Sequence, residues 1–219
     1  MNFQKKRTTV CVQGLGFVGS AMSILIGSTQ KKNLPLFNVY GLDQKTNTGI
    51  EIIKKLNKGI LAIKNTDKKL ISAFKLLKKF KNFHATYDPK VISKSSIVIC
   101  NVNLDIIKSK KKPDWSSGTL KKAVVTIGKN IQENCLVIIE TTVPPGTCEK
   151  FVLPLLKKEF IKRKINPSKV LLAHSFERVM PGENYLDSIK NYWRVFSANN
   201  NKAAIKCEQF YKKIINTKK

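Results

Sequence analysis

Arginine and acidic residues are scarce in this chain, although its net charge is strongly positive. Only four of the 41 basic residues are arginine, and 14 acidic residues leave a formal net charge of +27. Proteins that read nucleic acids rely on the bidentate guanidinium of arginine for base and phosphate contacts. Lysine is spread over the whole chain here, so we expect it to cover solvated helix faces and predict no nucleic-acid partner. A basic nucleic-acid binder is the competing interpretation.

Little in the chain could form a metal centre or a disulfide framework. The cysteines are odd in number and form no CxxC pair, and the two histidines, His84 and His174, lie far apart in the sequence. These absences argue against a zinc site and against disulfide cross-links. We therefore predict no metal and a reducing, cytoplasmic compartment. The five cysteines are Cys11, Cys100, Cys135, Cys148 and Cys207.

Long apolar runs are also missing. Basic residues at 5–7 precede an apolar stretch that reaches Gly27, an arrangement that can be mistaken for a signal peptide. That stretch contains Gln13, four glycines and two serines, and no run approaches the roughly 18 apolar residues of a membrane helix. We predict no transmembrane segment and no membrane partner.

The composition that remains is that of a globular protein, with 219 residues, 42% hydrophobic and 25% charged. Predicted strands alternate with predicted helices throughout. This pattern predicts an α/β fold, a doubly wound parallel sheet with helices on both faces, in a single domain. The expected strand order is 3-2-1-4-5-6 with one short extra strand. We expect strands at 8–13, 37–42, 82–86, 96–102, 135–139, 170–173 and 193–196, a loop at 174–191, and helices at 20–26, 49–56, 67–80, 120–131, 147–162 (kinked at Pro154) and 201–215.

A glycine loop follows the first predicted strand. Gly14, Gly16 and Gly19 form a GxGxxG pattern between a strand and a helix, and Asp43 ends the next strand 24 residues later. In this context Gly14 permits the tight turn, Gly16 permits close approach of a pyrophosphate, and Gly19 permits close helix packing. A carboxylate at Asp43 would bind the ribose hydroxyls of NAD. The pattern predicts a Rossmann-type fold that takes NAD, and Lys45 leaves NADP open as an alternative.

Two further segments follow predicted strands, at the sheet edge where open α/β folds bind ligands. Residues 140–147 read ETTVPPGT and residues 174–182 read HSFERVMPG. Turns fixed by proline, with Thr147 capping a helix, would explain the first segment. They would not explain why Glu177 and Arg178 stand together after an apolar strand.

With these motifs the chain resembles the UDP-glucose/GDP-mannose dehydrogenase family from Val10 to about Ile215. The resemblance rests on the glycine loop, on Asp43, on residues 141–147 and on residues 175–182. It implies an NAD-dependent enzyme that oxidises the C6 alcohol of a UDP- or GDP-sugar to a carboxylate in polysaccharide biosynthesis. Members pass through an aldehyde, which a cysteine captures, and a thioester, which water hydrolyses.

The resemblance also implies roles for individual residues. Thr142 would help to hold the catalytic water, and Glu177 would act on that water as the general base. Thr141 would lie near the nicotinamide. Phe17 and Val18 belong to the glycine loop, Val102 and Asn103 to the loop that passes the cofactor ribose, and Arg178, Val179, Met180, Pro181 and Gly182 to the loop that lines the sugar-nucleotide site.

The chain departs from the family at several points. Phe176 stands where many members have proline, and Leu104 and Asp105 stand where many have Thr-Pro. The family's nucleophilic cysteine, in a GGxCxPKD-like motif, has no counterpart here, and neither do the lysine and asparagine of its central helix. Cys148 follows Thr147 at a predicted helix start, which could lower its thiol pKa, but we interpret it as incidental.

The resulting prediction is an NAD-binding domain over residues 1–200, closed by a helix and a lysine-rich end at 201–219. The central and C-terminal domains of the family are absent. A second polypeptide or a lost segment would supply them, and the chain alone is expected to be inactive. A truncated, non-catalytic NAD-binding module is the alternative.

Overall fold

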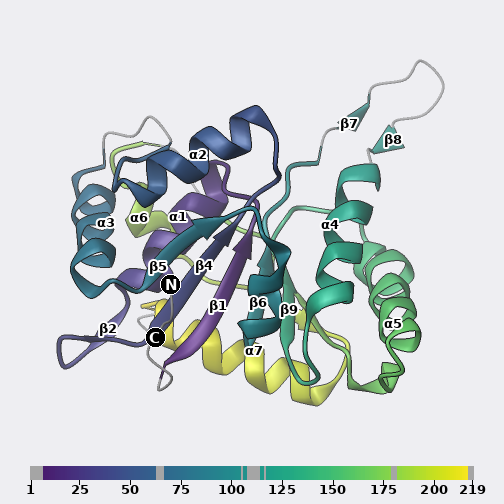
Figure 1. The fold of residues 1–219 in the computed structure, drawn as a ribbon. Coiled ribbons are helices and arrows are strands. Elements are labelled where there is room, and N and C mark those ends of the chain that lie inside the picture. Colours follow the sequence, from purple (N-terminus) through teal and green to yellow (C-terminus); the bar gives the residue numbers. More distant parts are fainter. Residues whose placement is uncertain are drawn as a thin grey trace.

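A seven-stranded sheet organises the computed structural model, in the order β11-β10-β9-β6-β1-β4-β5 (Figure 1). The structure describes residues 7–62, 67–104, 106–107, 114–115, 117–178 and 182–216. The strands are β1 (Thr8–Gln13), β4 (Phe37–Leu42), β5 (Phe83–Thr86), β6 (Ile97–Cys100), β9 (Leu136–Ile139), β10 (Leu171–His174) and β11 (Ser197–Ala198).

The strand order confirms the doubly wound topology. Numbered as they follow one another in this sheet, the strands lie in the order 3-2-1-4-5-6, and β11 adds the short extra strand at the β10 edge. Within this sheet, neighbouring strands run parallel except for β10 and β11, which are antiparallel. Parallel strands joined by helical crossovers place their carboxyl ends at one edge, where the sheet can bind a ligand.

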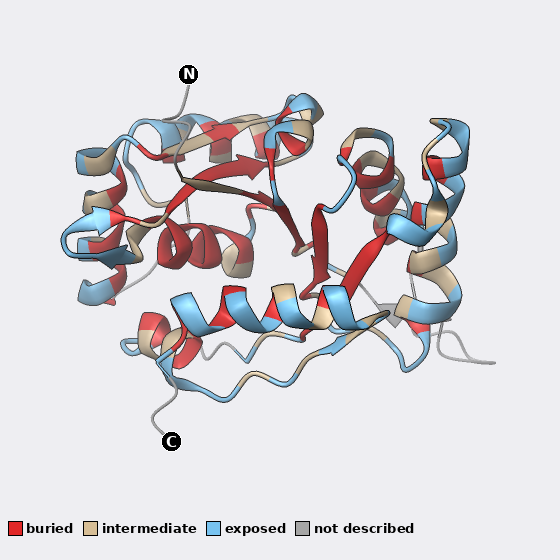
Figure 2. Ribbon diagram, turned by 90° about the horizontal axis from the view of Figure 1, so that it is seen from below, coloured by how far each residue is buried: buried red, intermediate tan, exposed pale blue. Residues whose placement is uncertain are grey.

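Two hydrophobic cores, one on each face, explain the nearly continuous apolar character of the strands. In β1, Val10 and Val12 pack into one core, whereas Cys11 between them packs into the other. Figure 2 shows the strands buried and the outward sides of the helices exposed. A sheet covered on both faces needs apolar residues at consecutive positions.

Each core is closed by its own set of helices. The first is closed by α1 (Phe17–Ser28), α2 (Asn47–Asn57), α3 (Lys68–Phe80), α6 (Tyr185–Asn191) and α7 (Asn201–Ile214). The second is closed by the 3₁₀ helix η1 (Pro89–Lys94), α4 (Ser117–Asn130), the π-helical turn η2 (Cys148–Val152) and α5 (Leu153–Lys162). A short 3₁₀ turn, η3 (Pro167–Lys169), leads into β10.

The expected loop at 174–191 is wrong in its last third, because α6 forms there. Tyr185, Leu186 and Ile189 are buried and pack into the first core. Their spacing places them on one side of a helix, and this short amphipathic pattern was not recognised in the sequence. The correction matters for the site, because Tyr185 reaches the glycine loop.

The expected strand at 193–196 is also wrong. The pairing with β10 begins later, with Ser197 opposite His174 and Ala198 opposite Ala173. Trp193 is 66% exposed as a residue, whereas the side chain of Arg194 is only 4% exposed. Aromatic and β-branched residues favour a strand there, but the described segment forms none and buries the Arg194 side chain instead.

The long helix expected at 147–162 is divided in two. The π-helical turn η2 passes into α5 at Leu153, and Pro154 lies in the first turn of α5. Proline is tolerated there because its missing N–H group has no partner in a first turn. The change of helix type falls one residue before Pro154, and the predicted kink at Pro154 stays a prediction.

Two small hairpins lie outside the main sheet. They pair β2 (Gln30–Lys31) with β3 (Leu34–Pro35), and β7 (Ile106–Ile107) with β8 (Asp114–Trp115). The lysine-rich sequence at 108–112 predicts a solvated loop, and these residues lie outside those that the structure describes. Within the described parts of the chain, no helix combines the length and apolar character needed to cross a membrane.

Candidate functional site

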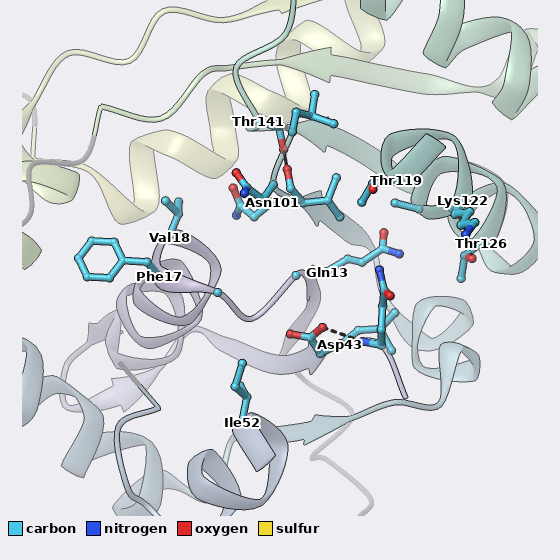
Figure 3. A pocket seen from close by; sticks show the side chains of 18 of the residues that line it. Gln13, Phe17, Val18, Asp43, Ile52, Asn101, Thr119, Lys122, Thr126 and Thr141 are labelled. Atoms are coloured by element: carbon cyan, nitrogen blue, oxygen red, sulfur yellow. Dashed lines mark hydrogen bonds between the residues drawn. The ribbon is translucent and has the colours of Figure 1, made fainter. Parts of the chain in front are cut away.

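A pocket of about 1030 Å³ opens at the carboxyl ends of the central strands (Figure 3). The loops after β1, β4, β6 and β9 form most of it, and α4 contributes one wall. Figure 3 shows Asp43 on one side of the glycine loop and Asn101 with Thr141 on the other. The pocket is lined by Gln13, Gly14, Gly16, Phe17, Val18, Leu42, Asp43, Gln44, Lys45, Ile52, Tyr87, Pro89, Asn101, Val102, Asn103, Leu104, Thr119, Lys122, Ala123, Thr126, Thr141, Thr142 and Glu177.

Glycine stands at each of the three positions of the loop for a different structural reason. Gly14 has a φ of +92°, and a Cβ there would lie 2.6 Å from the backbone oxygen of Asn101. A Cβ at Gly19 would lie 1.7 Å from the backbone oxygen of Gly14. Among the described residues, nothing lies within 4 Å of a Cβ added at Gly16. Gly14 and Gly19 are therefore required by the fold itself, whereas Gly16 faces open space that a ligand could occupy.

The start of α1 faces this open space. Gly16 is the N-cap, its residue type supplies no side-chain hydrogen bond, and the first turn holds no acidic residue. The first N–H groups of a helix lack partners within the helix and carry the positive end of its dipole. This arrangement suits a pyrophosphate.

Asp43 is tied to the glycine loop. Its Oδ2 accepts a hydrogen bond from the backbone N–H of Leu15 at 2.9 Å, and its Oδ1 accepts one from the backbone N–H of Gln44 at 2.7 Å. A carboxylate can accept about four hydrogen bonds, so these two bonds orient the group and leave capacity for the two hydroxyls of a ribose. The residues fit the adenosine half of NAD.

Lys45 contacts an aromatic ring at the pocket wall. Its Nζ lies 5.1 Å from the centre of the Tyr87 ring, a cation–π contact at the pocket wall. On the facing wall, Thr119, Lys122 and Thr126 come from α4. Neither Tyr87 nor these α4 residues were singled out in the sequence, because no local pattern marks one surface residue of a helix as pocket lining.

The residues expected near the nicotinamide, the cofactor ribose and the catalytic water line one pocket. Thr141 Oγ1 donates a hydrogen bond to the backbone oxygen of Val102 at 2.8 Å, which joins the loops after β9 and β6. Val102, Asn103, Thr142 and Thr141 all line the pocket, as does Glu177.

The loop expected to bind the sugar nucleotide is described only in part. Val179, Met180 and Pro181 lie outside the described residues. Arg178 is exposed, and its guanidinium lies 5.7 Å from the centre of the Tyr192 ring. Gly182 has a φ of +140°, and neither it nor Arg178 is among the described residues that line the pocket. Their role in substrate binding stays a prediction.

Tyr185 contacts the glycine loop through Phe17. Its ring stacks on that of Phe17 with the centres 4.4 Å apart, and its hydroxyl donates to the Phe17 backbone oxygen at 2.9 Å. Burial, with a smaller contribution from nearby Glu177, raises the pKa of the Tyr185 hydroxyl. Tyr185 therefore remains a neutral donor, and the sequence did not point to it because it lies 168 residues from Phe17.

Glu140 is fully buried beneath the pocket. Its Oε2 accepts from Asn101 Nδ2 at 3.0 Å, and its Oε1 accepts from the Tyr211 hydroxyl at 2.9 Å, while Arg194 Nη1 lies 3.9 Å from Oε1. Burial raises the pKa of Glu140, and Arg194 opposes this rise most strongly, followed by Asn101 and Tyr211. Glu140 was part of the motif at 140–147, but nothing in the sequence indicated these partners.

The described cysteines are poorly suited to nucleophilic chemistry. Burial raises the pKa of the Cys100, Cys135 and Cys207 thiols to about 12, and that of Cys11 further. Cys148 stands at the start of η2, yet burial raises its pKa to about 11. The thiolate is the reactive form, so the idea that a helix start activates Cys148 is not supported. Within the described residues, no cluster of three metal-ligating side chains forms.

Comparison with known proteins gives a consistent result. The family model described as "UDP-glucose/GDP-mannose dehydrogenase family, NAD binding domain" matches residues 8–215. The UDP-N-acetyl-D-mannosamine dehydrogenase of Pyrococcus horikoshii is 29% identical over 94% of this chain and 44% of its own length. The UDP-N-acetyl-D-glucosamine 6-dehydrogenase of Pseudomonas aeruginosa is 30% identical over 96% of this chain and 44% of its own length.

The fold has solved counterparts as well. The crystal structure of the NDP-N-acetyl-D-galactosaminuronic acid dehydrogenase of Methanosarcina mazei superposes with a TM-score of 0.84 at 24% identity, over 97% of this chain and 43% of that one. The chain thus spans less than half the length of the relatives that it matches. Because the family model covers nearly the whole chain and the pocket fits NAD, the chain belongs to the UDP-glucose/GDP-mannose dehydrogenase family, in which it corresponds to the NAD-binding domain.

Proposed function

We propose that this chain is the NAD-binding part of a nucleotide-sugar 6-dehydrogenase, which oxidises the C6 alcohol of a UDP- or GDP-sugar to a carboxylate in polysaccharide biosynthesis. The observation that carries this proposal is one pocket that holds both the NAD-type glycine loop with Asp43 and the pair Thr142 and Glu177. The names of the relatives favour a UDP-linked N-acetylated sugar among these substrates.

NAD, when bound, accepts the hydride that leaves the sugar carbon. The chain's own residues bind and orient the cofactor and the sugar nucleotide. Asp43 holds the adenosine ribose, and the start of α1 holds the pyrophosphate. Thr141 lies near the nicotinamide, and Val102 and Asn103 belong to the loop that passes the cofactor ribose. Arg178 to Gly182 form the loop that we assign to the sugar nucleotide.

Glu177 is the proposed general base. It is half-buried and lines the pocket, and its backbone N–H donates to the backbone oxygen of Glu140 at 3.2 Å. A carboxylate placed in this way can take a proton from a water molecule. Thr142 lines the same pocket and offers a hydroxyl that can hold that water.

The thiol of the reaction has to come from elsewhere. None of the five cysteines is among the described residues that line the pocket, and burial raises the pKa of each thiol, so we assign the capture of an aldehyde to none of them. We propose that a second polypeptide, or a further segment, supplies the cysteine together with the remaining domains. The chain alone should then bind NAD without turning over a sugar nucleotide.

These raised thiol pKa values also favour one alternative, a non-catalytic NAD-binding module. Titration calorimetry with NAD, followed by NADH absorbance with UDP-N-acetylmannosamine, UDP-N-acetylglucosamine and GDP-mannose, separates the possibilities. We expect NAD binding and no NADH from the chain alone. NADH formation when a polypeptide with the family's remaining domains is added would support the dehydrogenase. Absence of NADH in that mixture would favour the non-catalytic module. Absence of NAD binding by the chain would contradict both the dehydrogenase and the module.

Robust NADH production by the chain alone would show that the essential parts are assigned wrongly. Cys148→Ser would then be the first variant to make. In an assembled, active enzyme, Glu177→Gln should stall at the thioester, with one covalent adduct per site detected by mass spectrometry.

A further inference from the structure

A charged network lies buried directly behind the cofactor pocket. Glu140 is 0% exposed, and the side chain of Arg194 is 4% exposed. The network joins the end of β9, the loop after β6, the segment before β11 and helix α7. Burying a charge is costly unless it is paired and hydrogen-bonded, so its location next to the pocket calls for a reason.

The side-chain oxygens of Glu140 are divided between two elements. Oε2 accepts from Asn101 Nδ2 at 3.0 Å, and Oε1 accepts from the Tyr211 hydroxyl at 2.9 Å. Tyr211 comes from α7, which packs on β9 and β10 and crosses below the sheet in Figure 1. Arg194 faces Oε1 at 3.9 Å, and its guanidinium carbon lies 5.6 Å from the centre of the Tyr211 ring. Oε1 of Glu140 is therefore held by Tyr211 and faced by Arg194.

The other side carries Asn101, which lies against the glycine loop. The Asn101 backbone N–H donates to the Gln13 backbone oxygen at 2.8 Å. Its backbone oxygen lies 2.6 Å, and its Cβ 3.4 Å, from the positions that a Cβ would take on Gly14 and Gly19 respectively. A shift of Asn101 would therefore displace the loop that receives the pyrophosphate.

We propose that Glu140 is a positioning residue for NAD: its buried carboxylate, held by Tyr211 and Arg194, fixes Asn101 against the glycine loop. The proposal rests on the NAD pocket described above and adds a role for α7, which does not itself line the described pocket. The backbone of Glu140 also accepts the Glu177 N–H, so one residue sets both the cofactor side and the proposed water side.

Glu140→Gln tests this role with almost no change of shape. An amide has one acceptor oxygen where a carboxylate has two, so the new side chain cannot accept from both Asn101 and Tyr211 on separate oxygens. One of these hydrogen bonds is lost, or the amide nitrogen donates where a carboxylate oxygen accepted. Arg194 then faces a neutral group. If the binding-competent loop falls to about a tenth of the population, the dissociation constant for NAD rises about tenfold.

Two further variants sharpen the test. Tyr211→Phe removes one of the two groups that hold Oε1 of Glu140 and leaves Arg194 and the Asn101 bond, so it should weaken NAD binding in the same direction as Glu140→Gln but less, by about threefold. Phe160→Leu loosens the second core at α5, away from the pocket, and should lower the unfolding midpoint without changing NAD affinity. Calorimetry measures the affinities, and urea unfolding measures the stabilities.

Amide hydrogen exchange, followed by NMR without NAD, provides an independent measurement. The Asn101 and Gly14 amides donate to Gln13 and Leu42 respectively. They should exchange about tenfold faster in Glu140→Gln, and no faster than the global unfolding allows in Phe160→Leu.

Unchanged NAD affinity and unchanged exchange at Asn101 and Gly14 in Glu140→Gln would overturn the proposal. The proposal would also be overturned if NAD affinity fell in Phe160→Leu as much, for the same loss of stability, as it falls in Glu140→Gln. If the unmodified chain failed to bind NAD, the proposed function would fall, while the exchange data would still decide whether Glu140 holds the loop.

Discussion

The carboxylate of Asp43 accepts a hydrogen bond from the backbone N–H of Leu15 at 2.9 Å, across 28 residues of sequence. This bond connects the end of β4 to the glycine loop after β1, so the group that we propose for the ribose and the loop that we propose for the pyrophosphate are directly linked. Changes at either should therefore affect NAD binding.

Asp43→Ala should weaken NAD binding by about 1–3 kcal/mol, the range for loss of a hydrogen bond to a charged group. The unmodified chain should bind NAD more tightly than NADP, because the carboxylate repels a 2′-phosphate and Lys45 is engaged with Tyr87. Calorimetry with both cofactors measures this preference. Equal or tighter binding of NADP by the unmodified chain would contradict it.

Gly16→Ala and Gly19→Ala should separate binding from folding. A Cβ at Gly16 meets open space, so the unfolding free energy should change by less than about 1 kcal/mol, as for an exchange at a helix N-cap. NAD affinity should nevertheless fall at least tenfold, because the added methyl group occupies the approach of the pyrophosphate.

Gly19→Ala places a Cβ 1.7 Å from the backbone oxygen of Gly14, which cannot move aside as a side chain could. Stability should fall by about 1–3 kcal/mol or more. Urea unfolding and calorimetry on both variants provide the check. A Gly16→Ala protein with normal NAD affinity would place the pyrophosphate elsewhere.

The stability should depend on pH through Glu140. Burial raises the pKa of Glu140 above its ordinary value of 4.5, against the opposing effects of Arg194, Asn101 and Tyr211 and with a small contribution from Glu177. Between 4.5 and the raised pKa, the folded protein therefore binds more protons than the unfolded chain. The contribution of Glu140 to the unfolding free energy falls as pH rises through that window.

Glu140→Gln cannot titrate at this position, so the difference in unfolding free energy between the unmodified chain and this variant should decrease as pH rises from 4.5. Urea unfolding of both proteins at several pH values measures this difference. A difference that is constant, or that grows with pH, would show that the pKa of Glu140 is not raised in the folded protein.

The lysine-rich surface should bind DNA only weakly. Lysine dominates the basic residues, and exposed ion pairs such as Lys55 with Glu51 and Lys212 with Glu208 occur on helix surfaces. Non-specific binding to phosphates should fade by about 200 mM salt. Fluorescence anisotropy with a DNA duplex across a salt series measures it, and a sequence-specific complex that survives at that salt would argue for a nucleic-acid partner.

Local sequence was sufficient for much of the architecture. The runs at Thr8–Gln13 and Phe37–Leu42 form strands as predicted, because short, β-branched, nearly continuous apolar runs are typical of strands covered on both faces. The glycine loop and Asp43 could likewise be located, since a tight turn, a close approach and an acid at the end of the next strand are requirements that act over a few residues.

The support behind the pocket was decided only by the tertiary structure. Glu140 meets Asn101 across 39 residues and Tyr211 across 71, and Tyr185 meets Phe17 across 168. No periodicity records such pairs, because the partners are brought together by the winding of the sheet and by the helices that cover it. The sequence by itself determined the residues that we propose for NAD binding, and the fold determined which buried groups contact them.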